Sequence, residues 1–137
     1  MITLKDFLTA SGKYPERENS VELTPDKLEN AVKLLTAVNA LLAEIGIKTS
    51  IVSSGFRPSA ANTAAGGAKK SNHTICLAVD LLDSKTQTLA SKMTPDLLRK
   101  YGLFMEDEKY TRGKNTNWVH LQLTPNMLDR PNRRFIP

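Results

Sequence analysis

Apolar positions recur at three- and four-residue intervals between residues 24 and 46, and this spacing predicts one long amphipathic helix. Thr24-Pro25-Asp26 favours its start, because it supplies a threonine N-cap, a proline at the first helical position and an acid in the first turn. Gly46 is typical of its end. The apolar stripe consists of Leu28, Ala31, Val32, Leu35, Val38, Leu42 and Ile45. We expect this helix to lie on a sheet and to act as scaffold.

Several shorter apolar segments predict strands, at residues 47–54, 77–82, 103–106 and 118–123. In the last of these, alternation with period two places Trp118, His120 and Gln122 on one face of the strand.

Shorter helices are predicted at residues 4–10, 59–65, 84–90 and 94–101. Thr94-Pro95-Asp96 repeats the cap, proline and acid of the long helix, whereas Gly66-Gly67 indicates a break and a loop. Residues 1–20 are expected to form an N-terminal arm, and residues 124–137 a proline- and arginine-rich tail that wraps the surface.

The chain of 137 residues is expected to form a single domain, residues 1–137, with a core large enough to need no disulfide. No apolar run approaches the length of a membrane span. The first residues do not resemble a signal peptide, because Asp6 interrupts a very short apolar stretch. We therefore expect synthesis in the cytoplasm, with any action outside it depending on release by another agent.

A net charge of +5 and a pI near 9.4 indicate attraction to polyanions, such as nucleic acid or an anionic cell wall. Nucleic acid is the weaker choice, because the chain has no helix-turn-helix, zinc-finger or RNP pattern. The basic residues are scattered apart from Lys69-Lys70 and an arginine cluster at residues 130–134, which could contact a wall polymer or be solvated.

The candidate chemistry centres on His73, Asp80 and His120, which follow or lie within predicted strands. Two histidines and a carboxylate can hold a catalytic zinc ion and leave its fourth position to water. The alternatives are packed or surface histidines, and a salt bridge from Asp80 to a lysine or arginine. Cys76, the single cysteine, excludes an internal disulfide and is either a third type of ligand or a buried, apolar-like residue.

The patterns Ser53-Ser54-Gly55-Phe56-Arg57-Pro58, Ser71-Asn72-His73, Ala78-Val79-Asp80 and Trp118-Val119-His120 together resemble the zinc D-alanyl-D-alanine carboxypeptidase family. That family includes the L-alanyl-D-glutamate endopeptidases that bacteriophages use as endolysins, and the hedgehog signalling domain shares its fold. The resemblance runs from about Val21 to the C-terminus. It implies an α+β fold with helices over a small, mainly antiparallel sheet, a Zn2+ cofactor held by His73, Asp80 and His120, and the peptidoglycan stem peptide as substrate of a monomeric enzyme.

The resemblance also implies roles for residues around the metal. Arg57 would face a substrate carboxylate, for which a guanidinium is well shaped, and Asn62 would order the loop that follows it. Family members often place the general base three residues before the last histidine, where this chain has Asn117. The base is then expected from Glu106 or, second, from Asp107, although both could belong to a solvated turn. Cys76 stands where the family usually has glycine.

The sequence is consistent with two functions. One is a zinc peptidase that cleaves the peptidoglycan stem, as a phage-type endolysin released to the wall, a related wall enzyme or a virion-associated enzyme. The other is a non-catalytic, zinc-containing wall-binding or structural module, which Asn117 favours.

Overall fold

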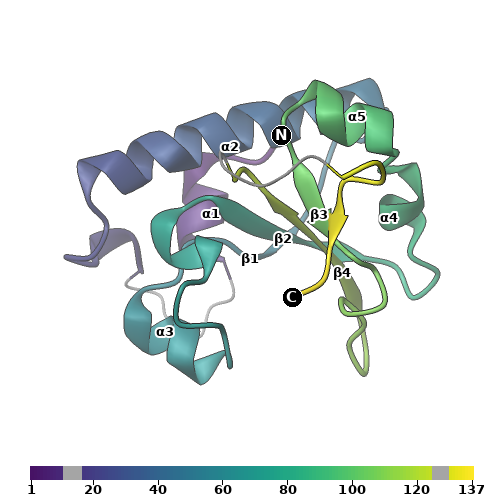
Figure 1. Cartoon of the computed structure of the whole chain (residues 1–137). Coiled ribbons are helices and arrows are strands. Elements are labelled where there is room, and N and C mark those ends of the chain that lie inside the picture. Colours follow the sequence, from purple (N-terminus) through teal and green to yellow (C-terminus); the bar gives the residue numbers. More distant parts are fainter. Residues whose placement is uncertain (11–16, 125–129) are drawn as a thin grey trace.

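The computed structural model describes residues 1–10, 17–124 and 130–137. Within this part of the chain, a five-stranded mixed sheet packs against helices (Figure 1). The predicted α+β class is therefore confirmed. Among the described residues there is no helix with the length and apolar character that a membrane crossing requires.

The strands lie in the order β1-β2-β4-β3-β5. Their bounds are β1 Val52–Ser54, β2 Ala78–Asp83, β3 Phe104–Glu106, β4 Asn117–Gln122 and β5 Arg134–Phe135. Neighbouring strands are antiparallel except for β3 and β5, which run parallel. The central pair, β2 and β4, is in register along its length, so Asp80 lies directly opposite His120. Directly opposed residues share one face of a sheet, and this register therefore brings the two side chains together.

Helices flank the strands on both sides, with α2 above and α3 below them in Figure 1. The helices are α1 Leu4–Thr9, α2 Pro25–Glu44, α3 Ser59–Ala64, α4 Thr88–Lys92 and α5 Pro95–Lys100, with 3-10 turns η1 Arg17–Asn19 and η2 Asn72–Ile75. The long helix α2 has nearly its predicted bounds, but its buried face differs slightly. Val32 is exposed, whereas Leu34 and Leu41 are fully buried.

The core forms where α1 and α2 meet the strands, and it fixes the chain just before Arg57. Gly55 lies so close to α1 that an added Cβ would be 2.0 Å from the carbonyl oxygen of Phe7. Only glycine allows this approach. Arg17 adds a second restraint, because its buried side chain donates to the carbonyl oxygen of Phe56 at 3.0 Å. The turn that presents Arg57 is thus held from two sides.

Two element predictions are wrong in their bounds. Of the predicted strand 47–54, only Val52–Ser54 forms a strand, because the register of its pairing with β2 is irregular. The predicted helix 84–90 begins only at Thr88. Residues 84–87 form a turn instead, and the carboxylate of Asp83 accepts from the backbone N–H groups of Leu89 and Ala90. This satisfies donors that a helix start otherwise leaves without partners.

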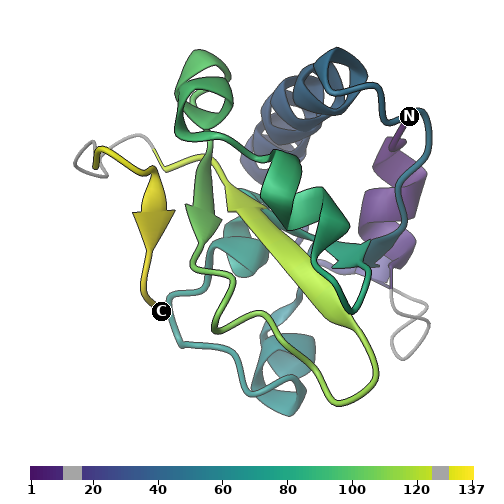
Figure 2. The ribbon, with the colours of Figure 1, turned by 90° about the vertical axis from the view of Figure 1, so that its right-hand side faces the viewer.

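The tail does more than wrap the surface. Figure 2 shows β5 beside β3, on the side away from β4. The arginines of the tail are largely engaged within the fold, since Arg133 is buried over the ring of Phe104 at 3.6 Å and Arg134 pairs with Glu108 at 3.1 Å. The expectation of a solvated basic tail is therefore wrong for these two residues.

Candidate metal centre

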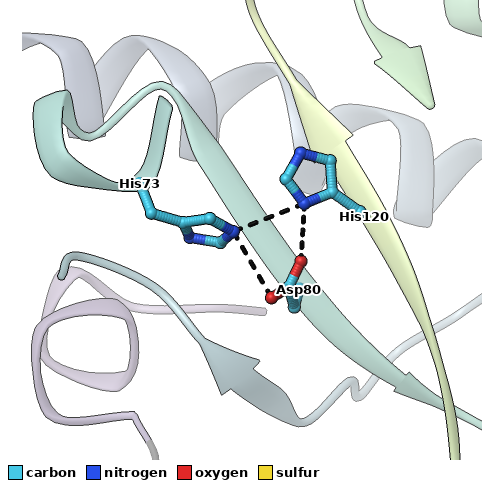
Figure 3. A group of neighbouring side chains, drawn as sticks. All are labelled: His73, Asp80 and His120. Atoms are coloured by element: carbon cyan, nitrogen blue, oxygen red, sulfur yellow. Dashed lines mark hydrogen bonds and ion pairs between the residues drawn. The ribbon is translucent and has the colours of Figure 1, made fainter. Parts of the chain in front are cut away.

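Three side chains that are far apart in the sequence converge beside the central strands. His73 comes from η2, Asp80 from the middle of β2 and His120 from β4, and the three point toward one another (Figure 3). Their potential ligand atoms all lie within 4.8 Å of one another. His73 Nε2 is 3.3 Å from both His120 Nδ1 and Asp80 Oδ2, and His120 Nδ1 is 2.7 Å from Asp80 Oδ1.

Two of these separations fit a tetrahedral zinc site, and the third, 2.7 Å from His120 Nδ1 to Asp80 Oδ1, is a hydrogen-bond distance. Bonds of about 2.0–2.1 Å at tetrahedral angles place neighbouring ligand atoms about 3.3 Å apart, which is the distance from His73 Nε2 to each of the other two ligand atoms. The donor set, two imidazole nitrogens and one carboxylate oxygen, is a known set for catalytic zinc with an open position. The described residues therefore fit the metal that the sequence predicts.

The local structure around His73 explains how a loop residue becomes a fixed ligand. Ser71 caps η2 by accepting from the backbone N–H of His73, and Cys76 ends it in the left-handed conformation, with φ of 60°. Left-handed backbone is strained for most residues but free for glycine. This conformation explains why glycine is usual at the position of Cys76 in the resembling family. A cysteine here adopts it at a cost in conformational energy.

Each imidazole also has a partner on its far nitrogen. His73 Nδ1 donates to the carbonyl oxygen of Gly55 at 2.8 Å, and His120 Nε2 lies 3.1 Å from Gln122 Oε1. Such outer partners fix the orientation and protonation of metal-binding histidines. The two rings are thus aimed at Asp80 before any ion is bound.

The electrostatics of the cluster suit ligation. Burial raises the pKa of Asp80, but the neighbouring imidazoles outweigh it and hold that pKa well below its ordinary value. Burial lowers the pKa of His73, and Asp80 offsets this only in part. Burial, the largest single effect, also lowers the pKa of His120, but the hydrogen bond to Asp80 and its charge, with smaller contributions from Gln122 and Glu106, together raise that pKa. These shifts favour an ionised Asp80 and a neutral His73, the forms in which the two side chains bind a metal ion, whereas the shift of His120 favours a protonated form from which a metal ion would displace the proton.

Arg57 is hydrogen-bonded directly to one of the candidate ligands, Asp80. Its Nη2 donates to Asp80 Oδ2 at 2.8 Å, and its Nε donates to Ser54 Oγ at 2.8 Å. The salt bridge considered as an alternative for Asp80 therefore exists together with the histidine contacts. The predicted role of Arg57, contact with a substrate carboxylate, stays a prediction.

A cavity of about 460 Å³ opens at the cluster. Its lining includes Arg57, His73, Asp80, His120 and Glu106. The pairing of β3 with β4 explains the place of Glu106. Phe104 is opposite Gln122 and Met105 is opposite Leu121, so Glu106 follows the last paired residue at the end of β3 that leads toward His120. Burial, with a smaller contribution from Asp80, raises the pKa of Glu106.

Asp107, the second candidate base, is not among the residues that line this cavity. It lines a neighbouring hollow together with Arg130 and Phe135, and its carboxylate accepts from the backbone N–H of Lys109. Of the two acids that the sequence offers, the structure thus brings only Glu106 to the cluster.

Asn117 occupies the position of the usual family base, yet it faces away from the cluster. It lies three residues before His120 on β4, and alternate residues of a strand face opposite sides. Its Nδ2 donates to the carbonyl oxygens of Ser84 and Lys85, both at 3.1 Å. In this chain the residue holds the turn of residues 84–87.

Asn62 and Cys76 have structural roles that their positions make clear. The Nδ2 of Asn62 donates to the carbonyl oxygen of Ala68 at 2.8 Å, which orders the loop of residues 65–68 at the rim of the cavity. The side chain of Cys76 is buried, and burial raises the pKa of its thiol to about 12. Cys76 is absent from the convergent group of ligand atoms.

Several residues that line the cavity were not predicted from the sequence as site residues. Phe135 from β5 packs edge-on against His120, with ring centroids 5.7 Å apart, and Pro137 and Lys70 also line the wall. Nothing local in the tail indicates the pairing that places Phe135. Gln122 also lines the cavity, as expected from the strand alternation that places it on the face of His120.

Comparison with known proteins adds an independent finding. A family model described as Peptidase M15 matches residues 13–122, a range that contains all three candidate ligands, Arg57 and Glu106. The comparison with curated proteins gives no match.

Proposed function

The chain belongs to the peptidase M15 family of zinc-dependent metallopeptidases, and on this premise we propose that it hydrolyses the peptide stem of bacterial peptidoglycan. The observation that carries the proposal is the convergence of His73, Asp80 and His120 at a cavity that Glu106 also lines. A bound zinc ion would supply Lewis acidity and lower the pKa of water toward about 7.

Glu106 is the proposed general base. Its carboxylate lies at the cavity beside His120, and its raised pKa suits a group that accepts a proton from water and passes it to the leaving amine. Burial moves the pKa of Glu106 upward, toward the neutral range in which such an exchange is efficient. No other acid besides Glu106 and the ligand Asp80 lines the cavity in the described part of the chain.

Arg57 and Lys70 supply positive charge at the same cavity. Peptidoglycan stems carry free carboxylates, and a guanidinium can hold one through two parallel hydrogen bonds. Arg57 is the proposed contact for such a carboxylate, with its Nε already held by Ser54. The net charge of +5 favours approach to an anionic wall.

We further propose an endolysin-type role, in which the enzyme reaches the wall after release from the cell or as part of a virion. The bond cut is proposed to be either the L-alanyl-D-glutamate bond or the terminal D-alanyl-D-alanine bond of the stem. Mass spectrometry of digested muropeptides separates these products, because only the second reaction releases free alanine.

The experiment that tests the function is a wall-degradation assay with purified peptidoglycan, with and without a chelator, on the wild type and on Glu106→Gln. We expect peptidoglycan hydrolysis only by the metal-loaded wild type. A folded, zinc-containing wild type that leaves peptidoglycan and muropeptides intact would instead support the non-catalytic wall-binding or structural module.

A further inference from the structure

Gln122 is a buried polar residue at the end of β4, and the peptidase chemistry described above gives it no task. Its side chain is 4% exposed, and it lies two residues after His120 on the same face of the strand. A polar side chain is costly to bury unless its groups are hydrogen-bonded. The partners of its amide therefore indicate what it does.

Both ends of the Gln122 amide are engaged. Oε1 is 3.1 Å from His120 Nε2, and Nε2 donates to Thr124 Oγ1 at 2.9 Å. Thr124 Oγ1 also accepts from Asn72 Nδ2 at 3.3 Å. A chain of hydrogen bonds thus runs from the candidate ligand His120 to Asn72, which precedes the other candidate histidine ligand, His73.

The direction of this chain determines the state of His120. Since Gln122 Nε2 is used to donate to Thr124, Oε1 faces the imidazole, and an amide oxygen can only accept. His120 Nε2 must then carry a proton. In the metal-free protein Nδ1 shares a proton with Asp80 at 2.7 Å, and a metal ion that displaces this proton meets the lone pair of Nδ1, the atom that faces both Asp80 and His73.

We propose that Gln122 is a positioning residue that selects the Nε2-protonated tautomer of His120 and so presents Nδ1 to the metal. This inference rests on the proposed function of the cluster as a zinc site. The backbone carbonyl of Gly55 does the same for His73, whose Nδ1 it engages. The two histidines therefore bind through opposite nitrogens, each fixed by a different kind of acceptor.

Three variants test the proposal by zinc affinity, measured by competition with a chromogenic chelator. Gln122→Met keeps the volume but removes the acceptor, and we expect its zinc Kd to rise about 10–100-fold. Gln122→Glu keeps an acceptor that cannot donate, and we expect zinc affinity at least equal to that of the wild type. Val119→Ala, a buried change on the opposite face of β4, should lower the unfolding midpoint without altering zinc affinity.

A second measurement needs no variant. In a long-range proton–nitrogen correlation spectrum of the zinc-loaded wild type, His120 should show a protonated Nε2 and a metal-bound Nδ1. The reverse assignment overturns the proposal, as does a Gln122→Met protein that binds zinc within twofold of the wild type. A folded wild type that binds no zinc would instead remove the proposed metal site itself, and this inference with it.

Discussion

Arg57 donates to the Oδ2 of Asp80 at 2.8 Å, and both side chains are largely buried, with 15% and 8% of their surface exposed. A buried carboxylate depends on such charge-assisted bonds. We expect Arg57→Gln to lower the free energy of unfolding of the metal-free protein by about 1.5–3 kcal/mol, because the bond to a charged group is lost. Urea unfolding in the presence of a chelator measures this change.

The matched control is Lys33→Gln. Lys33 forms an ion pair with Glu29 at 3.0 Å, but both side chains are more than half exposed. Exposed pairs contribute little, so this variant should change the free energy of unfolding by less than about 0.5 kcal/mol. If both variants lowered the free energy of unfolding equally, the buried Arg57–Asp80 pair would stabilise the protein no more than an exposed ion pair.

Glu106→Gln should abolish most activity while leaving the site intact. The substitution removes the proposed base but preserves its size, and we expect kcat to fall by about 10²–10⁴-fold with zinc content unchanged. Steady-state kinetics on purified muropeptides, with metal analysis of the same samples, measures both quantities.

Asp107→Asn is the control for that variant, since Asp107 lies next in the sequence but outside the cavity. Its activity should match the wild type. If Asp107→Asn lost activity and Glu106→Gln retained it, the assignment of the base would have to be exchanged.

The pH dependence of activity follows from the same residue. Burial raises the pKa of Glu106 above its ordinary value of 4.5. A general base acts in its ionised form, so activity should be lost as pH falls through this raised pKa. The acid limb of the kcat profile should therefore lie above pH 4.5. An acid limb below that value would contradict the role of Glu106.

Cys76 should be inert in the native protein. Its thiol is buried, and the pKa raised to about 12 leaves almost no thiolate at neutral pH. We expect a colorimetric thiol reagent to label it only after unfolding. Cys76→Ser should retain zinc, whereas a Cys76→Ser protein that folds but loses zinc would reveal a ligand role.

The helices were the part of the fold that local sequence signals predicted best. The cap, proline and glycine around α2 predicted a helix within a residue or two of its observed bounds, because these signals are local. Thr94 even supplies the expected side-chain cap to Leu97, although Thr24 forms no such bond. The bounds near residue 47 were wrong because they depend on how the segment pairs with β2, and those near residue 84 because the carboxylate of Asp83 caps a helix that begins only at Thr88.

The candidate ligands could be named from spacing and residue type, but their partners could not. Asp80 meets His120 through the β2–β4 register, and Glu106 comes to the cavity through the pairing of β3 with β4. Phe135 reaches the site through a parallel pairing between distant segments, for which the sequence has no local signal. The bond between Arg57 and Asp80 depends on a turn held by α1, which is equally invisible along the chain.

The sharpest test of the proposed metal site is the zinc content of the purified protein after loading with zinc and extensive dialysis. We expect about one tightly bound zinc ion per wild-type chain, and almost none in His73→Ala, Asp80→Asn or His120→Ala. A folded wild-type protein that retains no zinc, or ligand variants that retain as much as the wild type, would contradict it.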